Sequence, residues 1–173
     1  MSLLCVGSVA LDTIETPHGK AGSILGGSAV YFSYGASFMS PVRLVGVVGN
    51  DFSQEEELEL LKSRRVDLRG LRTENGKTFR WTGRYVGDMG RAETLDVALG
   101  VFGDFQPVIP PYYQDSRYVF LANGSPKLQR KVLSQIRKPK LVVCDTMNYW
   151  IANEKKALLS LIERIDGLIV NND

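Results

Sequence analysis

The sequence predicts an α/β protein whose mostly parallel β-sheet is flanked by helices. Short apolar runs of strand length recur along the chain, and segments of helical period separate them. The runs are continuous rather than alternating, as expected of parallel strands that are buried on both faces. Residues 71–99 differ, because bulky apolar and polar residues alternate there, which indicates an exposed hairpin inserted into the α/β chain.

The composition fits one soluble globular domain. The chain has 173 residues, of which 44% are hydrophobic, which is enough to bury a core of its own. A net charge of +2 gives no basis for a nucleic-acid-binding or membrane-binding surface. No apolar stretch of about 18 residues and no signal-peptide pattern is present, so we expect a cytoplasmic protein. Cys5 and Cys144 fall in expected buried strands and are interpreted as small hydrophobic residues, with a disulfide or metal pair as the less favoured alternative.

Five apolar runs are expected to form the core strands: Leu3–Val9, Val42–Val48, Arg117–Ala122, Leu141–Cys144 and Gly167–Val170. Helices are expected between them. Ser53 and Glu56 have the spacing of a capping box at the start of one helix. Ser125 and Pro126 are a suitable N-cap and first-turn pair for another.

The most informative stretch is 25–52. Gly26 and Gly27 allow close approach of the backbone to a neighbour, and a segment of helical period follows them directly. Such a helix directs its free N–H groups and positive dipole end at the glycine pair, which suits a polar, oxygen-rich ligand. Asp12 follows the first expected strand, at the edge where open α/β sheets place their ligand sites.

Three elements carry a family resemblance: LLCVGSVALD, the Gly-Gly pair that opens a helix, and RLVGVVGNDF. In this order they resemble the N-terminal half of the ribokinase-like (PfkB) carbohydrate and nucleoside kinases, and the similarity extends over nearly the whole chain. It implies a ribokinase-like, Rossmann-like sheet with a small β-strand lid, formed by segments at about 13–25 and 71–99. These kinases are longer and carry their ATP-binding and catalytic elements in the second half. We therefore expect 1–173 to be the N-terminal part of a kinase domain without that half.

The resemblance implies ATP-dependent phosphorylation of a hydroxymethyl group on a sugar or nucleoside, with Mg²⁺. The family's catalytic base is an aspartate in a GAGD-type turn, which this sequence lacks, so that base is expected beyond Asp173. This chain would supply the acceptor-substrate half of the site and would be inactive alone. The alternative from a different class is a non-catalytic sugar- or nucleoside-binding module, or an inactive structural fragment.

The residues that the resemblance assigns to substrate binding are Asp12, Gly26, Gly27, Tyr31, Asn50, Asp51, Trp81 and Asn123. Two have a structural alternative, since Asp12 could cap a turn and Asn123 could be an ordinary helix-entry residue. Tyr31 stands where the family usually has an asparagine. This departure weakens an assignment to ribokinase or fructokinase and leaves nucleosides, inositols and other polyols open.

Asp145, Asn148 and Asn171 are expected near the transferred phosphate and Mg²⁺, again from the resemblance. The family's N-x-x-E motif would begin at Asn171 or Asn172. No residue is assigned as a direct metal ligand. His18 is the single histidine, which excludes a histidine-based metal site and a Ser-His-Asp arrangement. A phosphate-binding G-x-x-x-x-G-K-[ST] loop is absent from the sequence.

The hairpin at 71–99 has two different faces. Phe79 and Trp81 share one face at period two, whereas Arg80 and Arg84 share the other. The aromatic face suits a nucleoside base or a second subunit. Because a two-stranded hairpin is marginally stable alone, we expect either a homodimer through the lid or a mobile lid that is ordered by substrate.

Overall fold

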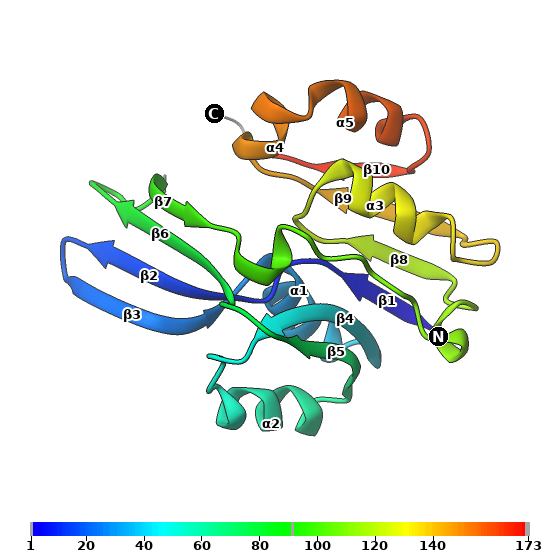
Figure 1. Cartoon of the computed structure of the whole chain (residues 1–173), viewed down its shortest axis with the longest axis horizontal. Coiled ribbons are helices and arrows are strands. Elements are labelled where there is room, and N and C mark those ends of the chain that lie inside the picture. Colours follow the sequence, from blue (N-terminus) through cyan, green and yellow to red (C-terminus); the bar gives the residue numbers. More distant parts are fainter. Residues whose placement is uncertain (1, 91, 172–173) are drawn as a thin grey trace.

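The structure, a computed structural model, describes residues 2–90 and 92–171 and contains two β-sheets (Figure 1). The core sheet has six strands in the order β10-β9-β8-β1-β4-β5, and every neighbouring pair is parallel. Its strands are β1 (Leu3–Val6), β4 (Val42–Gly49), β5 (Val66–Glu74), β8 (Tyr118–Leu121), β9 (Leu141–Asp145) and β10 (Gly167–Ile169). The helices are α1 (Ser28–Ser37), α2 (Glu55–Ser63), α3 (Pro126–Leu133), α4 (Asn148–Asn153) and α5 (Lys155–Ile162). The predicted α/β class is confirmed.

The core sheet separates two apolar clusters. Leu4 and Val6 of β1 belong to the cluster that includes side chains of α3 and α5, whereas Cys5 belongs to the cluster that includes side chains of α1 and α2. Successive strand residues point to opposite faces, so a strand covered on both faces must be apolar throughout. Cys5 and Cys144 are free and buried, and burial raises the pKa of each thiol to about 12. They are small hydrophobic residues, as interpreted from the sequence.

The smaller, four-stranded sheet is called the lid sheet here, and in Figure 1 it projects to the left of the core sheet. Its strands are β2 (Ala10–Thr16), β3 (Gly19–Gly26), β6 (Phe79–Tyr85) and β7 (Ala92–Ala98), in the order β3-β2-β6-β7. β2 is antiparallel to β3 and parallel to β6, and β6 forms an antiparallel hairpin with β7. The two expected lid segments therefore contribute to one sheet, except that 71–74 belong to β5 of the core sheet.

β5 has no counterpart among the five expected strands. It lies at the edge of the core sheet, where it pairs with β4 alone among the described residues. Arg69, Arg72 and Thr73 are exposed along it, so its sequence carries no continuous apolar run. Charged residues on an edge strand discourage pairing with other chains, which explains why this strand looks polar.

The helix starts were predicted with mixed success. Ser125 caps α3 as predicted, since its side chain accepts a hydrogen bond from the backbone N–H of Lys127, at 3.2 Å. The capping box predicted for Ser53 and Glu56 is wrong, because the N-cap of α2 is Gln54, one residue after Ser53, and it makes no side-chain cap bond. The segment Gly100–Tyr113 is irregular apart from two 3-10 turns, η1 (Gly100–Phe102) and η2 (Pro111–Tyr113). No helix in the described part of the chain is long and apolar enough to cross a membrane.

One part of the core sheet is only partly covered. Beside α1, a mainly apolar cavity of about 550 Å³ reaches across β8, β9 and β10. Leu141 and Ile169, which line it, are 43% and 52% exposed. The face of the sheet that carries α3 and α5 is therefore better covered than the face that carries α1.

Candidate functional site

A cavity of about 620 Å³ lies between the lid sheet and the carboxyl-terminal edge of the core sheet. The core wall includes residues that follow core strands: Ser8 after β1, Asn123 after β8, Met147 after β9 and Asn171 after β10. The lid wall includes Asp12, Phe79, Trp81, Tyr85, Thr94 and Val97. Open α/β sheets bind ligands at this edge, and the volume is in the range of small-molecule sites.

The structure divides the residues proposed from the sequence into two groups. Those that line the cavity are Asp12, Gly27, Tyr31, Trp81, Asn123, Asn148 and Asn171. Those that do not line it are Gly26, Asn50, Asp51 and Asp145. Asn172, the other candidate for the start of the N-x-x-E motif, lies outside the described residues.

Asp12 is a buried carboxylate with an unused acceptor. It lies within β2, so it is not a turn cap, and it is only 8% exposed. Its Oδ1 atom is buried and has no hydrogen-bond partner in the described part of the chain. Burial raises the pKa of Asp12 to about 6, although a hydrogen bond from the backbone of Gly27 opposes this rise. A buried oxygen without a partner is unfavourable, and a ligand hydroxyl in the cavity would satisfy it.

Gly26 contributes to the site through Asp12 rather than by lining the cavity. A Cβ atom at Gly26 would overlap the carboxylate of Asp12. The absence of a side chain at this position therefore gives the carboxylate its place against β3.

Gly27 and Ser8 determine how α1 begins. Gly27 has a φ of 95°, and a Cβ atom there would collide with the carbonyl of Ser8. Ser8 accepts hydrogen bonds from the first N–H groups of the helix, from Ser28 to its Oγ and from Ala29 to its carbonyl, both at 3.2 Å. The expectation that α1 directs free N–H groups at a ligand is wrong, because the first two N–H groups donate to Ser8 and those of Val30 and Tyr31 donate to the Gly27 carbonyl.

Asn123 is fixed by its neighbours. Its Oδ1 accepts a hydrogen bond from Trp150 Nε1 at 2.9 Å, and its Nδ2 lies 3.0 Å from the sulfur of Met147. Its backbone N–H donates to Ser28 Oγ at 2.7 Å. The amide is thereby held at the cavity wall, and one of its two N–H bonds remains for a ligand.

Asp145 lies behind this wall. Burial raises the pKa of its carboxyl group, and the nearby Ser28 hydroxyl and the backbone of Asn123 and Thr146 oppose this rise. Asp145 therefore lies beside Ser28 and the start of the loop after β8, and its contact with a ligand would be indirect.

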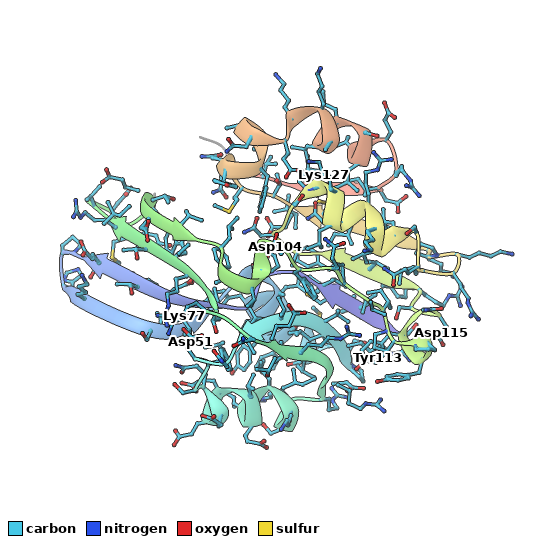
Figure 2. All side chains as sticks on the ribbon, in the orientation of Figure 1. Asp51, Lys77, Asp104, Tyr113, Asp115 and Lys127 are labelled. Carbon is cyan, nitrogen blue, oxygen red and sulfur yellow. The ribbon has the colours of Figure 1, made fainter. Side chains whose placement is uncertain are left out.

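Asn50 and Asp51 do not line the cavity: Asp51 joins the core sheet to Arg80 of the lid sheet, and Asn50 bonds the loop between β5 and β6. Asp51 Oδ1 accepts from the backbone N–H and the hydroxyl of Thr78, both at 2.7 Å, and its Oδ2 accepts from Arg80 at 2.9 Å. Burial by itself would raise the pKa of Asp51, but the hydrogen bonds from Arg80 and Thr78 hold it well below its usual range. Lys77 Nζ is 3.8 Å from Asp51, at the base of the lid sheet (Figure 2), and Asn50 donates to Asn75 at 3.0 Å.

Several cavity residues were not proposed from the sequence. Ser8, Met147 and Tyr149 line the core wall, and Tyr85 and Thr94 line the lid wall. Ser8 could have been found, because it is a polar residue directly after a strand, which is the signal that indicated Asn123. Thr94 gives no such signal, since its role depends on the pairing of β6 with β7.

The described residues do not form a metal site. Among 2–90 and 92–171 there is no group of three or more histidine, cysteine, aspartate or glutamate side chains that could hold a metal ion. Asn148 and Asn171, at the rim of the cavity, are neutral amides. The Mg²⁺ implied by the resemblance does not fit a donor set in this part of the chain, so no step is assigned to it.

No family model matches the chain. The chain is 28% identical over 145 residues to the cytidine kinase of Thermococcus kodakarensis. This alignment covers 83% of this chain and 51% of that protein. It therefore spans about half the length of the curated relative that it matches.

Three solved kinase structures are similar in shape to this chain. The nucleoside kinase of Methanocaldococcus jannaschii, described as an archaeal member of the ribokinase family, aligns with a TM-score of 0.70 and 22% identity over 96% of this chain and 59% of its own. The Burkholderia thailandensis nucleoside kinase in complex with inosine aligns with a TM-score of 0.79 and 15% identity, over 99% of this chain and 61% of that kinase. The chain has the ribokinase-like fold. A Pyrococcus horikoshii sugar kinase in complex with ATP is a further match, with a TM-score of 0.66 and 20% identity over 93% and 59%. The resemblance to the N-terminal half of such kinases, predicted from the sequence, is confirmed.

Proposed function

We propose that the protein transfers the terminal phosphoryl group of ATP to a hydroxymethyl group on a sugar or nucleoside. Residues 1–173 would form the acceptor side of the active site. The observation that carries this proposal is the carboxylate of Asp12, which lines a cavity at the ligand-binding edge of a ribokinase-like sheet and whose Oδ1 has no partner among the described residues. The similarity to a cytidine kinase and the fold shared with nucleoside and sugar kinases support it.

The described residues suit the positioning part of this reaction. Phosphoryl transfer depends mainly on the alignment of the acceptor and on electrostatic stabilisation. Asp12 would accept hydrogen bonds from acceptor hydroxyls, and the Asn123 amide would donate one from the opposite wall. The lid sheet would reduce the access of water to the acceptor.

We propose that Asn148 and Asn171 lie beside the transferred phosphoryl group, because both are at the rim of the cavity on the carboxyl-terminal side of the core sheet. Asp145 would support them indirectly, through Ser28 and the backbone of Thr146. ATP and Mg²⁺ are proposed for the whole protein. The group that removes the hydroxyl proton is proposed to be an aspartate outside these residues.

The homodimer expected through the lid stays a prediction. Val86, Met89 and Leu95, in or beside the hairpin of β6 and β7, are exposed and would be available to a second subunit. Sedimentation velocity of the purified protein, with Leu95→Lys as the variant that should dissociate a dimer, tests this point.

The proposed activity is tested by ADP release. The complete protein would be incubated with ATP, Mg²⁺ and one acceptor at a time from a panel of cytidine, inosine, D-ribose, D-fructose and myo-inositol. We expect ADP release with at least one acceptor, and loss of that activity in Asp12→Asn. Binding of an acceptor without ADP release would favour a non-catalytic binding module.

A further inference from the structure

The lid wall of the cavity is aromatic. Phe79, Trp81 and Tyr85 of β6 line the cavity, as do Tyr31 of α1 and Tyr149 of α4. Phe79, Trp81 and Tyr85 occupy odd positions along β6, so their side chains share one face of the strand. Arg80 and Arg84, at even positions, form ion pairs with Asp51 and Glu15. This division gives the lid sheet one aromatic face, toward the cavity, and one charged face.

Trp81 is held in a fixed orientation across its own sheet. A Cβ atom at Gly83, two residues along the same strand, would overlap the six-membered ring of the Trp81 indole. Gly83 does not have a positive φ, so its backbone conformation does not require glycine. The missing side chain therefore serves the indole, which lies over this position.

The indole N–H is also accounted for. Trp81 Nε1 donates to Thr94 Oγ1 at 3.2 Å, and Thr94 is the partner of Gly83 in the pairing of β6 with β7. With its polar atom bonded inside the lid sheet, the part of the indole that meets the cavity is carbon surface. A ring fixed in advance loses little conformational entropy when a ligand packs on it.

Asp12 lies next to this ring. Asp12 of β2 and Trp81 of β6 are paired positions on adjacent strands, so a carboxylate and an indole face one cavity from neighbouring sites. The phenol of Tyr31 is close to both elements: its pKa is raised by burial, and further by the charge of Asp12 and by Tyr85. The wall thus offers an acceptor for hydroxyl groups, a flat apolar surface beside it, and phenol groups at the edge.

We propose that the acceptor is a ribonucleoside whose base stacks on the indole of Trp81 while its ribose hydroxyls bind Asp12. Gly83 and Thr94 are positioning residues that hold the indole ring against the surface of the lid sheet. The inference rests on the proposed function, because it concerns the same cavity. A free sugar has no planar aromatic ring and would gain less from the flat indole surface than a base, whose stacking on an aromatic side chain contributes about 1–3 kcal/mol. A nucleoside joins a hydroxylated ribose to a planar base, so it can place the ribose at Asp12 and the base on Trp81 at the same time.

The test compares the affinities of cytidine, inosine and free D-ribose, measured by isothermal titration calorimetry on the protein and its variants. Stacking of a base on an aromatic side chain contributes about 1–3 kcal/mol, so Trp81→Leu should weaken nucleoside binding roughly 5- to 150-fold. The affinity for ribose, which has no base to stack on the indole, should change by a clearly smaller factor. Gly83→Ala keeps the tryptophan but displaces its ring, and it should weaken nucleoside binding to a similar extent. Thr94→Val releases the indole N–H and should have a smaller effect in the same direction.

Gly22→Ala is the matched control. Gly22 lies in β3 of the same sheet, has no positive φ, and a Cβ atom there would make only an ordinary contact, at 3.6 Å from Thr13. It should leave both affinities unchanged. If Gly83→Ala does not fold, Trp81→Leu and Thr94→Val decide the question.

The possible failures are distinguishable. Ribose binding as tight as nucleoside binding, or nucleoside binding that is unchanged in Trp81→Leu, would overturn the stacking site and leave the kinase proposal intact. Phosphorylation of ribose but not of nucleosides would have the same meaning. No binding and no phosphorylation of any acceptor would overturn the inference together with the proposed function.

Discussion

Replacing Asp12 by asparagine should have opposite effects on activity and on stability. The substitution keeps the size of the side chain and removes its charge. In the proposed site the carboxylate accepts hydrogen bonds from acceptor hydroxyls, and its Oδ1 has no other partner in the described residues. Loss of one partner of a buried charged hydrogen-bonded pair costs about 2–5 kcal/mol. At about 1.36 kcal/mol per tenfold change, kcat/KM should fall roughly 30- to 5,000-fold.

Stability should change in the other direction at neutral pH. Burial raises the pKa of Asp12 from 3.8 to about 6, so the folded protein binds this proton more tightly than the unfolded chain does. The stability that this protonation contributes is present below the unfolded pKa and is lost as the pH rises through the folded pKa. At about 1.36 kcal/mol per pKa unit the loss is on the order of 3 kcal/mol above pH 7, and Asp12→Asn avoids it.

The assay is urea unfolding of the original protein and of Asp12→Asn at pH 4 and at pH 7.5. We expect the free energy of unfolding of the original protein to decrease by about 1–3 kcal/mol between these pH values relative to the variant. A variant that is less stable than the original protein at pH 7.5 would show that Asp12 is a structural residue with satisfied hydrogen bonds. Unchanged kcat/KM would show that it does not touch the acceptor.

Two further substitutions test the arrangement around the cavity. Asp51→Ala removes the acceptor that holds Thr78 and Arg80, so it should cost about 2–4 kcal/mol in the free energy of unfolding and raise KM by loosening the lid sheet. The control Arg84→Gln breaks only exposed pairs, with Glu15 and Glu93, and should cost less than about 1 kcal/mol; equal losses in urea unfolding would refute a special role for Asp51. Gly27→Ala should destabilise by more than about 2 kcal/mol, because φ is 95° and the new methyl would meet the Ser8 carbonyl. Gly35→Ala, in the same helix with open space around it, should stabilise by about 0.5–1 kcal/mol, and thermal unfolding in which both changes act alike would contradict the role given to Gly27.

Much of the core sheet was predictable because its central strands are buried on both faces. Leu141–Cys144 is apolar throughout and Val42–Val48 is apolar except for Arg43, and each corresponds to a parallel strand in the structure. β5 could not be read in the same way, since an edge strand with Arg69 and Arg72 exposed lacks that pattern. The short helix α4 was also missed, because its six residues do not extend over two full turns of helical period.

The site was predictable where position along a strand decides the role. Asn123 follows β8 at the ligand-binding edge, and Trp81 shares a strand face with Phe79, and both facts follow from local spacing. Asp51 also follows a core strand, yet it bonds Thr78, which is distant in the sequence. Local spacing cannot show which of two polar residues after a strand turns toward the cavity and which turns toward the lid sheet. The parallel pairing of β2 with β6, which brings Asp12 beside Trp81, is likewise a long-range contact.

The central claim is that a hydroxymethyl group of an acceptor held by Asp12 becomes phosphorylated, and the most direct measurement is identification of the product. The complete protein would be incubated with ATP, Mg²⁺ and cytidine or inosine, and the product would be analysed by mass spectrometry and ³¹P NMR. The account predicts a nucleoside monophosphate whose phosphate is esterified to the oxygen of the hydroxymethyl group, formed by the original protein and reduced at least 30-fold in Asp12→Asn, on the order of the loss of a buried charged hydrogen bond. Phosphate on a ring hydroxyl, or equal product from Asp12→Asn, would contradict it.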